Sequence, residues 1–205
     1  MKITHEVLTT ALRGLRLAKP RKATLPVLDC VLLSANDRTV ALSITDLDQT
    51  LTYHGDLAEP SENQRRLVPL AVLQRVAKEM PRDAVLAFDK PGQLACAAGN
   101  VTTLVPFDAP TPAEYPNPVA VAGEEIELPP AALLALQEAR LAASDNLTRR
   151  NICCVCLEAT GVVATDGRQL FHANTLSLPL TGLKLLPAHK VLGFFDPAQP
   201  ARLRL

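Results

Sequence analysis

The chain has 205 residues, which suits one large domain or two small ones, and 48% of them are hydrophobic although only 3% are aromatic. Lys and Arg together number 21, as do Asp and Glu, so the net charge of zero indicates no partner by itself. No apolar run is long enough to span a membrane, the first residues do not form a signal peptide, and five cysteines without a regular framework favour reduced thiols in the cytoplasm.

In chain order, the first half predicts a short strand over residues 2–4 and then an amphipathic helix. The apolar residues of this helix recur at helical spacing and are Val7, Leu8, Ala11, Leu12 and Leu15. Two β-rich runs follow, with a break expected at the turn residues Asn36 and Asp37. Pro69 is expected to open a second helix, because the first turn of a helix does not need the missing N–H. Three further strands complete this half, over residues 83–88, 92–99 and 100–107.

The second half predicts the same order of elements after a proline-rich stretch, residues 107–119. A strand over residues 125–128 leads into a helix over residues 131–142. Two β-rich runs are broken at Thr160 and Gly161, and Pro187 is expected to open a second helix. The final strand, residues 201–205, is the last element.

The two halves also match residue by residue, which indicates an internal repeat. Residues 8–18 correspond to residues 132–142 at a shift of 124, and Cys30 corresponds to Cys154 at the same shift. The shift is 120 at Asp46 and 118 for residues 67–78. Matches in one order with a slowly drifting offset predict two copies of one module, at residues 1–119 and 120–205. The second copy lacks the counterpart of about the last thirty residues of the first.

Each copy contains a strand that ends in Thr-Asp, at Asp46 and at Asp166. An aspartate in a turn accepts hydrogen bonds from nearby backbone N–H groups, and Gly167 can adopt a positive φ. The alternative is a general base at Asp166 assisted by His172. No nucleophile or second carboxylate stands at a recognised spacing around them, and a turn explains the repetition better than an active site does.

The cysteines near residue 154 are expected to be core residues rather than metal ligands. Strand alternation places Cys154 and Cys156 on one face, and Cys154 repeats the position of Cys30. Structural zinc sites use paired clusters of ligands on loops, and the sequence has no second cluster. It also has no glycine-rich phosphate loop, so we expect neither a metal nor a cofactor.

Several segments together resemble the bacterial sliding clamp, the β subunit of DNA polymerase III. They are TLPVLDCVLLSA, ITDLDQTL, ELPPAALLALQEA and VVATDGRQLF. The resemblance covers the first domain of that family and most of the second, whereas the third domain is absent. It implies an α+β DNA-clamp fold with two repeated modules, each with two helices packed on one side of antiparallel sheet.

The resemblance also implies a function, that of a processivity factor of DNA polymerase III. Clamps of this family encircle duplex DNA without sequence preference and catalyse no reaction, so their inner helices should be moderately basic. In this sequence Arg13 and Arg16 lie opposite the apolar face of the first helix, and Arg75 and Lys78 share a face of the second. The alternative is that these side chains only solvate helix surfaces.

Two sets of site residues follow from the resemblance. The DNA-binding residues would be Arg21, Lys22, Arg75, Lys78, Asn146, Arg149, Arg150 and Asn151. A pocket for peptides of the polymerase and the clamp loader would have one wall here, formed by Ile152, Thr165, Arg168 and Leu170. The rest of that pocket belongs to segments that this sequence lacks, so only a partial groove is expected.

Two functional hypotheses remain open, with an enzyme as a distant third. The first is a sliding-clamp polypeptide in truncated form, in the cytoplasm and away from membranes. The second is a shortened clamp-like paralogue that binds replication partners without encircling DNA. In the family a ring closes between the first and third domains of two chains. We therefore expect self-association without a closed ring, through the free edge of the strand at residues 201–205.

Overall fold

The computed structural model describes residues 1–205 except residues 21–24, 48, 118–122, 124, 200 and 205. The chain divides into two compact units, Met1–Pro118 and Val119–Leu205, here called unit 1 and unit 2. Their assignment to the first two domains of a clamp stays a prediction.

Unit 1 begins with β1 (Lys2–Thr4) and α1 (His5–Leu15), as the sequence predicts. The Thr4 side chain caps α1 by accepting a hydrogen bond from the backbone N–H of Val7 at 3.3 Å. The predicted apolar face is buried at Leu8, Ala11, Leu12 and Leu15. The 3-10 helix η1 (Pro26–Asp29) precedes the next strand.

A long antiparallel hairpin follows, formed by β2 (Cys30–Thr45) and β3 (Thr50–Pro69). The break expected at Asn36 and Asp37 was wrong, because β2 continues through both residues. The irregularity is a bulge instead: the pairing register shifts on both sides of Asp37, which has a φ of 50°. Helix α2 (Leu70–Glu79) begins directly after Pro69, which stands at its N-cap.

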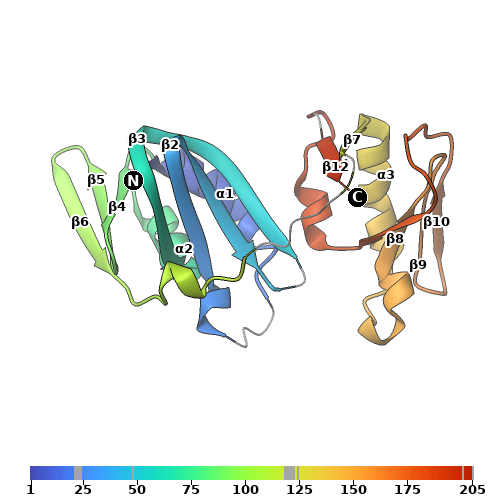
Figure 1. Ribbon diagram of the computed structural model, residues 1–205, viewed down its shortest axis with the longest axis horizontal. Coiled ribbons are helices and arrows are strands. Elements are labelled where there is room, and N and C mark those ends of the chain that lie inside the picture. Colours follow the sequence, from blue (N-terminus) through green and yellow to red (C-terminus); the bar gives the residue numbers. More distant parts are fainter. Residues whose placement is uncertain (21–24, 48, 118–122, 124, 200, 205) are drawn as a thin grey trace. The chain divides into compact units, whose positions relative to one another are not determined.

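The remaining predicted strands of unit 1 are confirmed as β4 (Val85–Lys90), β5 (Gln93–Ala98) and β6 (Val101–Pro106). They form an antiparallel sheet with β1 in the order β1-β4-β5-β6. Figure 1 shows α1 and α2 together behind the β2–β3 hairpin, on one face of it. The proline-rich stretch forms the 3-10 helix η2 (Pro112–Glu114) and buries Tyr115 against the core residues Val27 and Leu28.

Unit 2 also begins with a strand, a helix and a 3-10 helix, but four short strands take the place of the long hairpin of unit 1. Its elements are β7 (Glu125–Leu128), α3 (Pro130–Ala142), the 3-10 helix η3 (Leu147–Cys153), β8 (Cys154–Leu157), β9 (Val162–Thr165), β10 (Leu170–Ala173), β11 (Lys184–Pro187), the 3-10 helix η4 (Lys190–Phe194) and β12 (Ala201–Arg204). Four strands form a sheet in the order β10-β9-β8-β11, and β12 pairs with β7. Helix α3 packs its buried residues Ala132, Leu136 and Ala139 into the core of this unit.

The second helix of unit 2 differs from the expectation. Pro187 is the last residue of β11, and η4 is a five-residue 3-10 helix that begins at Lys190. His189 starts this helix by accepting a hydrogen bond from the N–H of Val191 at its Nδ1 atom. Gly193 has a low helix propensity, and Pro197 disfavours helical backbone at the residue before it, so the helix stays short.

The strand register supports the internal repeat. Cys30 pairs with Pro69 in unit 1, and the corresponding residues Cys154 and Pro187 pair in unit 2. Strand β12 pairs with β7 as β4 pairs with β1. The two units therefore share one plan, which allows their surfaces to be compared position by position.

Candidate nucleic-acid interface

A groove of about 380 Å³ runs between α1 and α2 on the surface of unit 1. It is lined by Thr9, Leu12, Arg13, Arg16, Gln74, Ala77 and Lys78. The helices are held together by buried residues such as Leu8, Leu12 and Leu73. The apolar face of each helix turns inward, and the polar side chains that remain outside line the groove.

A buried histidine ties the two helices together near the groove. The Nε2 atom of His5 lies 2.9 Å from the backbone oxygen of Ala77, so this nitrogen donates a hydrogen bond to that carbonyl. Ala77 lies in the last turn of α2, where carbonyl oxygens have no partner within the helix. His5 therefore satisfies an acceptor that would otherwise stay unpaired, and it fixes the spacing of the helices.

The groove is positively charged. Arg13, Arg16 and Lys78 are all exposed, and among the described residues no carboxylate lies within 4 Å of their charged groups. Three such cations in one depression favour an anionic ligand with several charges, such as a phosphate backbone.

The four DNA-binding residues predicted in unit 1 differ in their position relative to the groove. Lys78 lines the groove, whereas Arg75 is exposed on α2 but lies outside the groove lining. Arg21 and Lys22 lie outside the described residues, so their predicted role stays a prediction.

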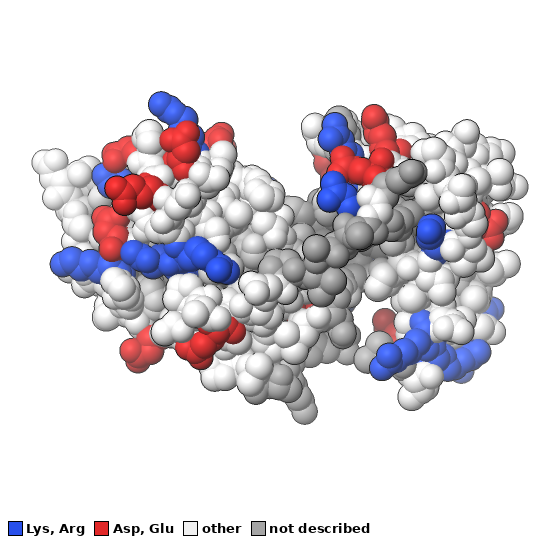
Figure 2. Space-filling view, viewed as in Figure 1, with Lys and Arg blue, Asp and Glu red and all other residues white. Residues whose placement is uncertain are grey.

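The predicted loop of unit 2 forms a second basic surface. An open depression of about 660 Å³ is lined by Thr148, Arg149, Arg150, Asn151 and Ile152. Asn146 begins η3, because its side-chain oxygen accepts a hydrogen bond from the N–H of Thr148 at 3.1 Å. Figure 2 shows the basic side chains of this loop as a blue cluster at the lower end of unit 2.

The predicted peptide wall lies next to this basic loop. A Cβ atom added to Gly167 would lie 3.3 Å from Nη1 of Arg149, so the guanidinium group rests against the turn between β9 and β10. Thr165 and Leu170 pair across that turn, and the Leu170 side chain is 70% exposed. Ile152 of η3 is half-buried. Arg168, in the turn itself, is exposed.

The two Thr-Asp turns share a hydrogen bond from the N–H three residues after the aspartate to its carboxylate, as expected from the repeat. In unit 2 a carboxylate oxygen of Asp166 accepts the N–H groups of Arg168 at 2.8 Å and Gln169 at 2.9 Å. These bonds, that of Gln169 first, lower the pKa of Asp166 below its ordinary value. In unit 1 Asp46 accepts the N–H of Gln49 at 2.7 Å. A carboxylate engaged in this way is a poor general base, which argues against a hydrolase centred on Asp166.

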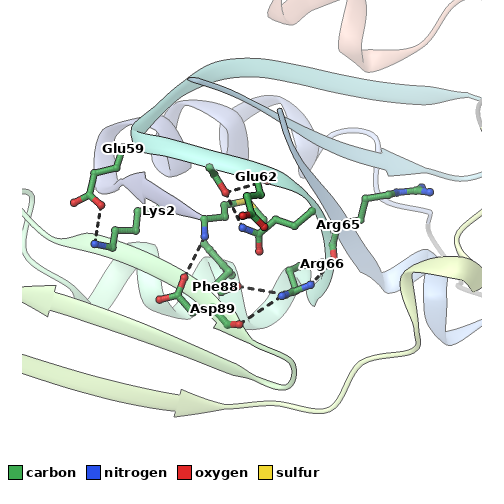
Figure 3. Close-up of polar contacts among 10 residues, drawn as sticks. Lys2, Glu59, Glu62, Arg65, Arg66, Phe88 and Asp89 are labelled. Atoms are coloured by element: carbon green, nitrogen blue, oxygen red, sulfur yellow. Dashed lines mark hydrogen bonds and ion pairs between the residues drawn. The ribbon is translucent and has the colours of Figure 1, made fainter. Parts of the chain in front are cut away.

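The face of unit 1 that Figure 2 shows carries both basic and acidic side chains. Lys2 is paired with Glu59 at 2.9 Å, and Arg66 donates hydrogen bonds to the carbonyl oxygens of Phe88 and Asp89 (Figure 3). These cations are engaged within the protein, in contrast to those of the groove.

The thiols do not form a metal centre in the part of the chain that the structure describes, where no three His, Cys, Asp or Glu side chains could hold an ion. Cys30 is buried, and burial raises its thiol pKa to about 11. Cys154 and Cys156 are half-buried, and burial also raises their pKa values. Neutral thiols are poor ligands and nucleophiles, so these cysteines act in packing.

The sequence predicted the basic side chains of the groove, but it did not predict that α1 and α2 form a groove between them. Arg13 and Arg16 stand on the polar face that helical periodicity gives α1. Their approach to Lys78 depends on how α1 packs against α2, and no local pattern encodes that packing.

No family model matches the chain. The β sliding clamp of Pseudomonas putida KT2440 is 32% identical over 131 residues, which are 62% of this chain and 36% of that protein. The β sliding clamp of Escherichia coli K12 is 27% identical over 181 residues, which are 83% of this chain and 47% of that protein. The chain thus spans about half the length, or less, of the curated relatives that it matches.

Solved structures show the same fold. The DNA polymerase III β subunit of Thermotoga maritima aligns with a TM-score of 0.80 at 22% identity, over 100% of this chain and 58% of that one. A sliding clamp of Pseudomonas aeruginosa bound to griselimycin also gives a TM-score of 0.80, at 21% identity, over 100% and 59% of the two chains. The chain therefore has the fold of the bacterial β sliding clamps and resembles them in sequence over about half of their length or less.

Proposed function

We propose that this chain is a sliding-clamp polypeptide that binds the phosphate backbone of duplex DNA without sequence preference. It acts as a non-catalytic processivity subunit of DNA polymerase III in the cytoplasm. Its partners are the duplex, the polymerase, the clamp loader and a second copy of the chain. No helix among the described residues is long and apolar enough to cross a membrane.

The observation that carries the proposal is the cationic groove on the helix pair of unit 1. Arg13, Arg16 and Lys78 converge there without a carboxylate partner in the described part of the chain. Long flexible cations on a helix surface hold phosphates through charge and read no base edges, so they permit movement along the duplex. The basic loop at Arg149 and Arg150 adds a second backbone contact of the same kind.

The clamp-like paralogue that binds partners without encircling DNA remains the second candidate function. The exposed Leu170 beside the turn at Arg168 favours it, because an apolar side chain exposed to this extent next to a basic group suits an amphipathic peptide. A peptide of a polymerase or clamp loader would place an apolar residue against Leu170 and Ile152.

The proposal is tested by removing the three cations of the groove and measuring duplex binding. The test variant carries Arg13→Gln, Arg16→Gln and Lys78→Gln. The matched control carries Arg38→Gln, Arg65→Gln and Lys90→Gln, which remove three exposed cations of the same unit outside the groove.

We expect the groove variant to bind a short duplex more weakly and with a shallower salt dependence. The slope of log K against log salt should become less negative by about 0.9 for each phosphate that the variant no longer neutralises. The control should bind within about twofold of the unchanged chain, since its substitutions leave the cations of the groove in place. An equal weakening in both variants would show that only net charge matters and would overturn the proposed site.

A further inference from the structure

We infer that, of the two helix surfaces, only the α1–α2 pair of unit 1 binds phosphate, because Gln137 hydrogen-bonds η4 to α3 and so closes the equivalent groove of unit 2. This inference rests on the proposed function and adds to it. It assigns phosphate binding to the α1–α2 surface of unit 1 and a packing role to the equivalent α3–η4 surface of unit 2.

The internal repeat identifies the equivalent positions. At the shift of 124, Arg13 corresponds to Gln137 and Arg16 to Arg140. At the shift of 118, Lys78 corresponds to Asp196. The matching strand pairs Cys30–Pro69 and Cys154–Pro187 support both shifts at the strands next to these helices.

Gln137 makes contacts that Arg13 does not make. Its Nε2 atom donates hydrogen bonds to the carbonyl oxygens of Leu192 at 3.0 Å and Phe195 at 2.6 Å. The counterparts of these two residues in unit 1 are Gln74 and Ala77, which line the opposite side of the open groove. The amide of Gln137 therefore occupies the space where unit 1 leaves room for a ligand.

Arg140 also packs against η4. A Cβ atom added to Gly193 would lie 2.5 Å from Nη2 of Arg140 and 3.0 Å from Cζ, so the guanidinium group packs directly on the backbone of η4. Its Nε atom is buried and has no hydrogen-bond partner among the described residues. Arg16, at the same position in unit 1, is exposed instead.

The charge of the two surfaces differs accordingly. The two cations of α2 in unit 1, Arg75 and Lys78, are replaced in unit 2 by Gly193 and the carboxylate of Asp196. Lys190 is exposed at the start of η4, but its counterpart Val72 does not line the groove of unit 1. A phosphate near this helix pair would meet a carboxylate and a packed arginine rather than three open cations.

The experiment compares two double variants of the full chain that each remove two positive charges. Arg13→Gln with Lys78→Gln changes unit 1, and Arg140→Gln with Lys190→Gln changes unit 2. Binding to a duplex of about one and a half turns is measured at several salt concentrations. We expect the slope of log K against log salt to become less negative by about 1.8 in the unit 1 double variant, which is about 0.9 for each of two phosphates. The unit 2 double variant should leave the slope unchanged.

A second measurement tests the closure itself and does not depend on DNA. Gln137→Glu removes the amide donor and should speed amide hydrogen exchange over residues 190–195, whereas Gln137→Lys keeps a donor and should largely preserve protection. Equal exchange in both variants and the unchanged chain would overturn the role of Gln137.

The outcomes separate the two proposals. An equal reduction of the salt slope by both double variants would overturn this inference and leave the proposed function standing. An unchanged chain that fails to bind any duplex would overturn the proposed function, and this inference with it.

Discussion

At the scale of single residues, the two Thr-Asp turns place unlike residues at the same positive φ, which strains only the leucine. Gly167 follows Asp166 with a φ of 91°, and Leu47 follows Asp46 with a φ of 79°. In both turns the Thr side-chain oxygen accepts the N–H of this residue, at 3.0 Å in unit 2 and 3.1 Å in unit 1. Glycine adopts a positive φ without steric cost, whereas leucine does not.

Substitutions at these two positions should therefore have opposite effects on stability. Gly167→Ala should lower the free energy of unfolding by about 1 kcal/mol, because a Cβ at positive φ is strained. Leu47→Gly should leave it unchanged or raise it by up to about 1 kcal/mol, since relief of strain offsets the added freedom of the unfolded chain. Urea denaturation of both variants gives the two values. A large decrease in the stability of Leu47→Gly would contradict the account.

Asp166 makes the stability of its turn dependent on pH. Its pKa is lowered in the folded chain by the N–H groups of Gln169 and Arg168. A lowered pKa contributes stability that is present above the unfolded value, near 3.8, and is lost as pH falls through the folded value.

Asp166→Asn should therefore reduce the loss of stability on acidification below about pH 4. The measurement is the free energy of unfolding of both chains from neutral pH down to about pH 3. The same acid dependence in both chains would count against the turn hydrogen bonds.

At the scale of elements, a buried hydrogen bond joins α1 and α2 in addition to their apolar packing. His5 donates a hydrogen bond to the last turn of α2 at the carbonyl of Ala77. His5→Ala should lower the free energy of unfolding by about 1 to 3 kcal/mol, because it leaves this carbonyl unpaired. Thr10→Ala on the same helix is the control and should cost much less. Equal effects in the two variants would show that the contact does not hold the helices.

The sequence predicted the elements that have a strong apolar periodicity of their own. It missed those where two signals conflict, such as a turn residue inside a long strand. The helix containing Leu8, Ala11 and Leu12 was correct because its periodicity is strong. The second helix of unit 2 was wrong because the helix starts at the cap His189 rather than after Pro187, and Gly193 and Pro197 keep it short. A turn was expected at Asp37, yet pairing along the whole hairpin retains the residue as a bulge.

The candidate site was predictable only in part for a related reason. Helical periodicity placed Arg13, Arg16 and Lys78 on polar faces, and the resemblance placed Arg149 and Arg150 in a basic loop. The closure of the unit 2 groove by Gln137 could not be predicted, because glutamine is an ordinary surface residue of a helix. Its role comes from two carbonyl oxygens of η4 that only the folded chain brings into reach.

At the scale of the whole molecule, the net charge is zero but the charge is unevenly distributed over the surface. The groove on the helix side of unit 1 gathers Arg13, Arg16 and Lys78 without carboxylate partners in the described part of the chain, whereas elsewhere on the unit Lys2 is paired with Glu59. Such separation gives a neutral protein a local attraction for a polyanion. The attraction should be weak and should fall as the salt concentration rises.

The most direct test of the central claim is the salt dependence of duplex binding by the unchanged chain. The binding constant is measured between about 50 and 200 mM salt on two duplexes of equal length and unrelated sequence. The account predicts the same affinity for both duplexes and a linear fall of log K with log salt, with a slope of about −0.9 for each phosphate contacted. A clear preference for one sequence, or binding that does not respond to salt, would contradict it.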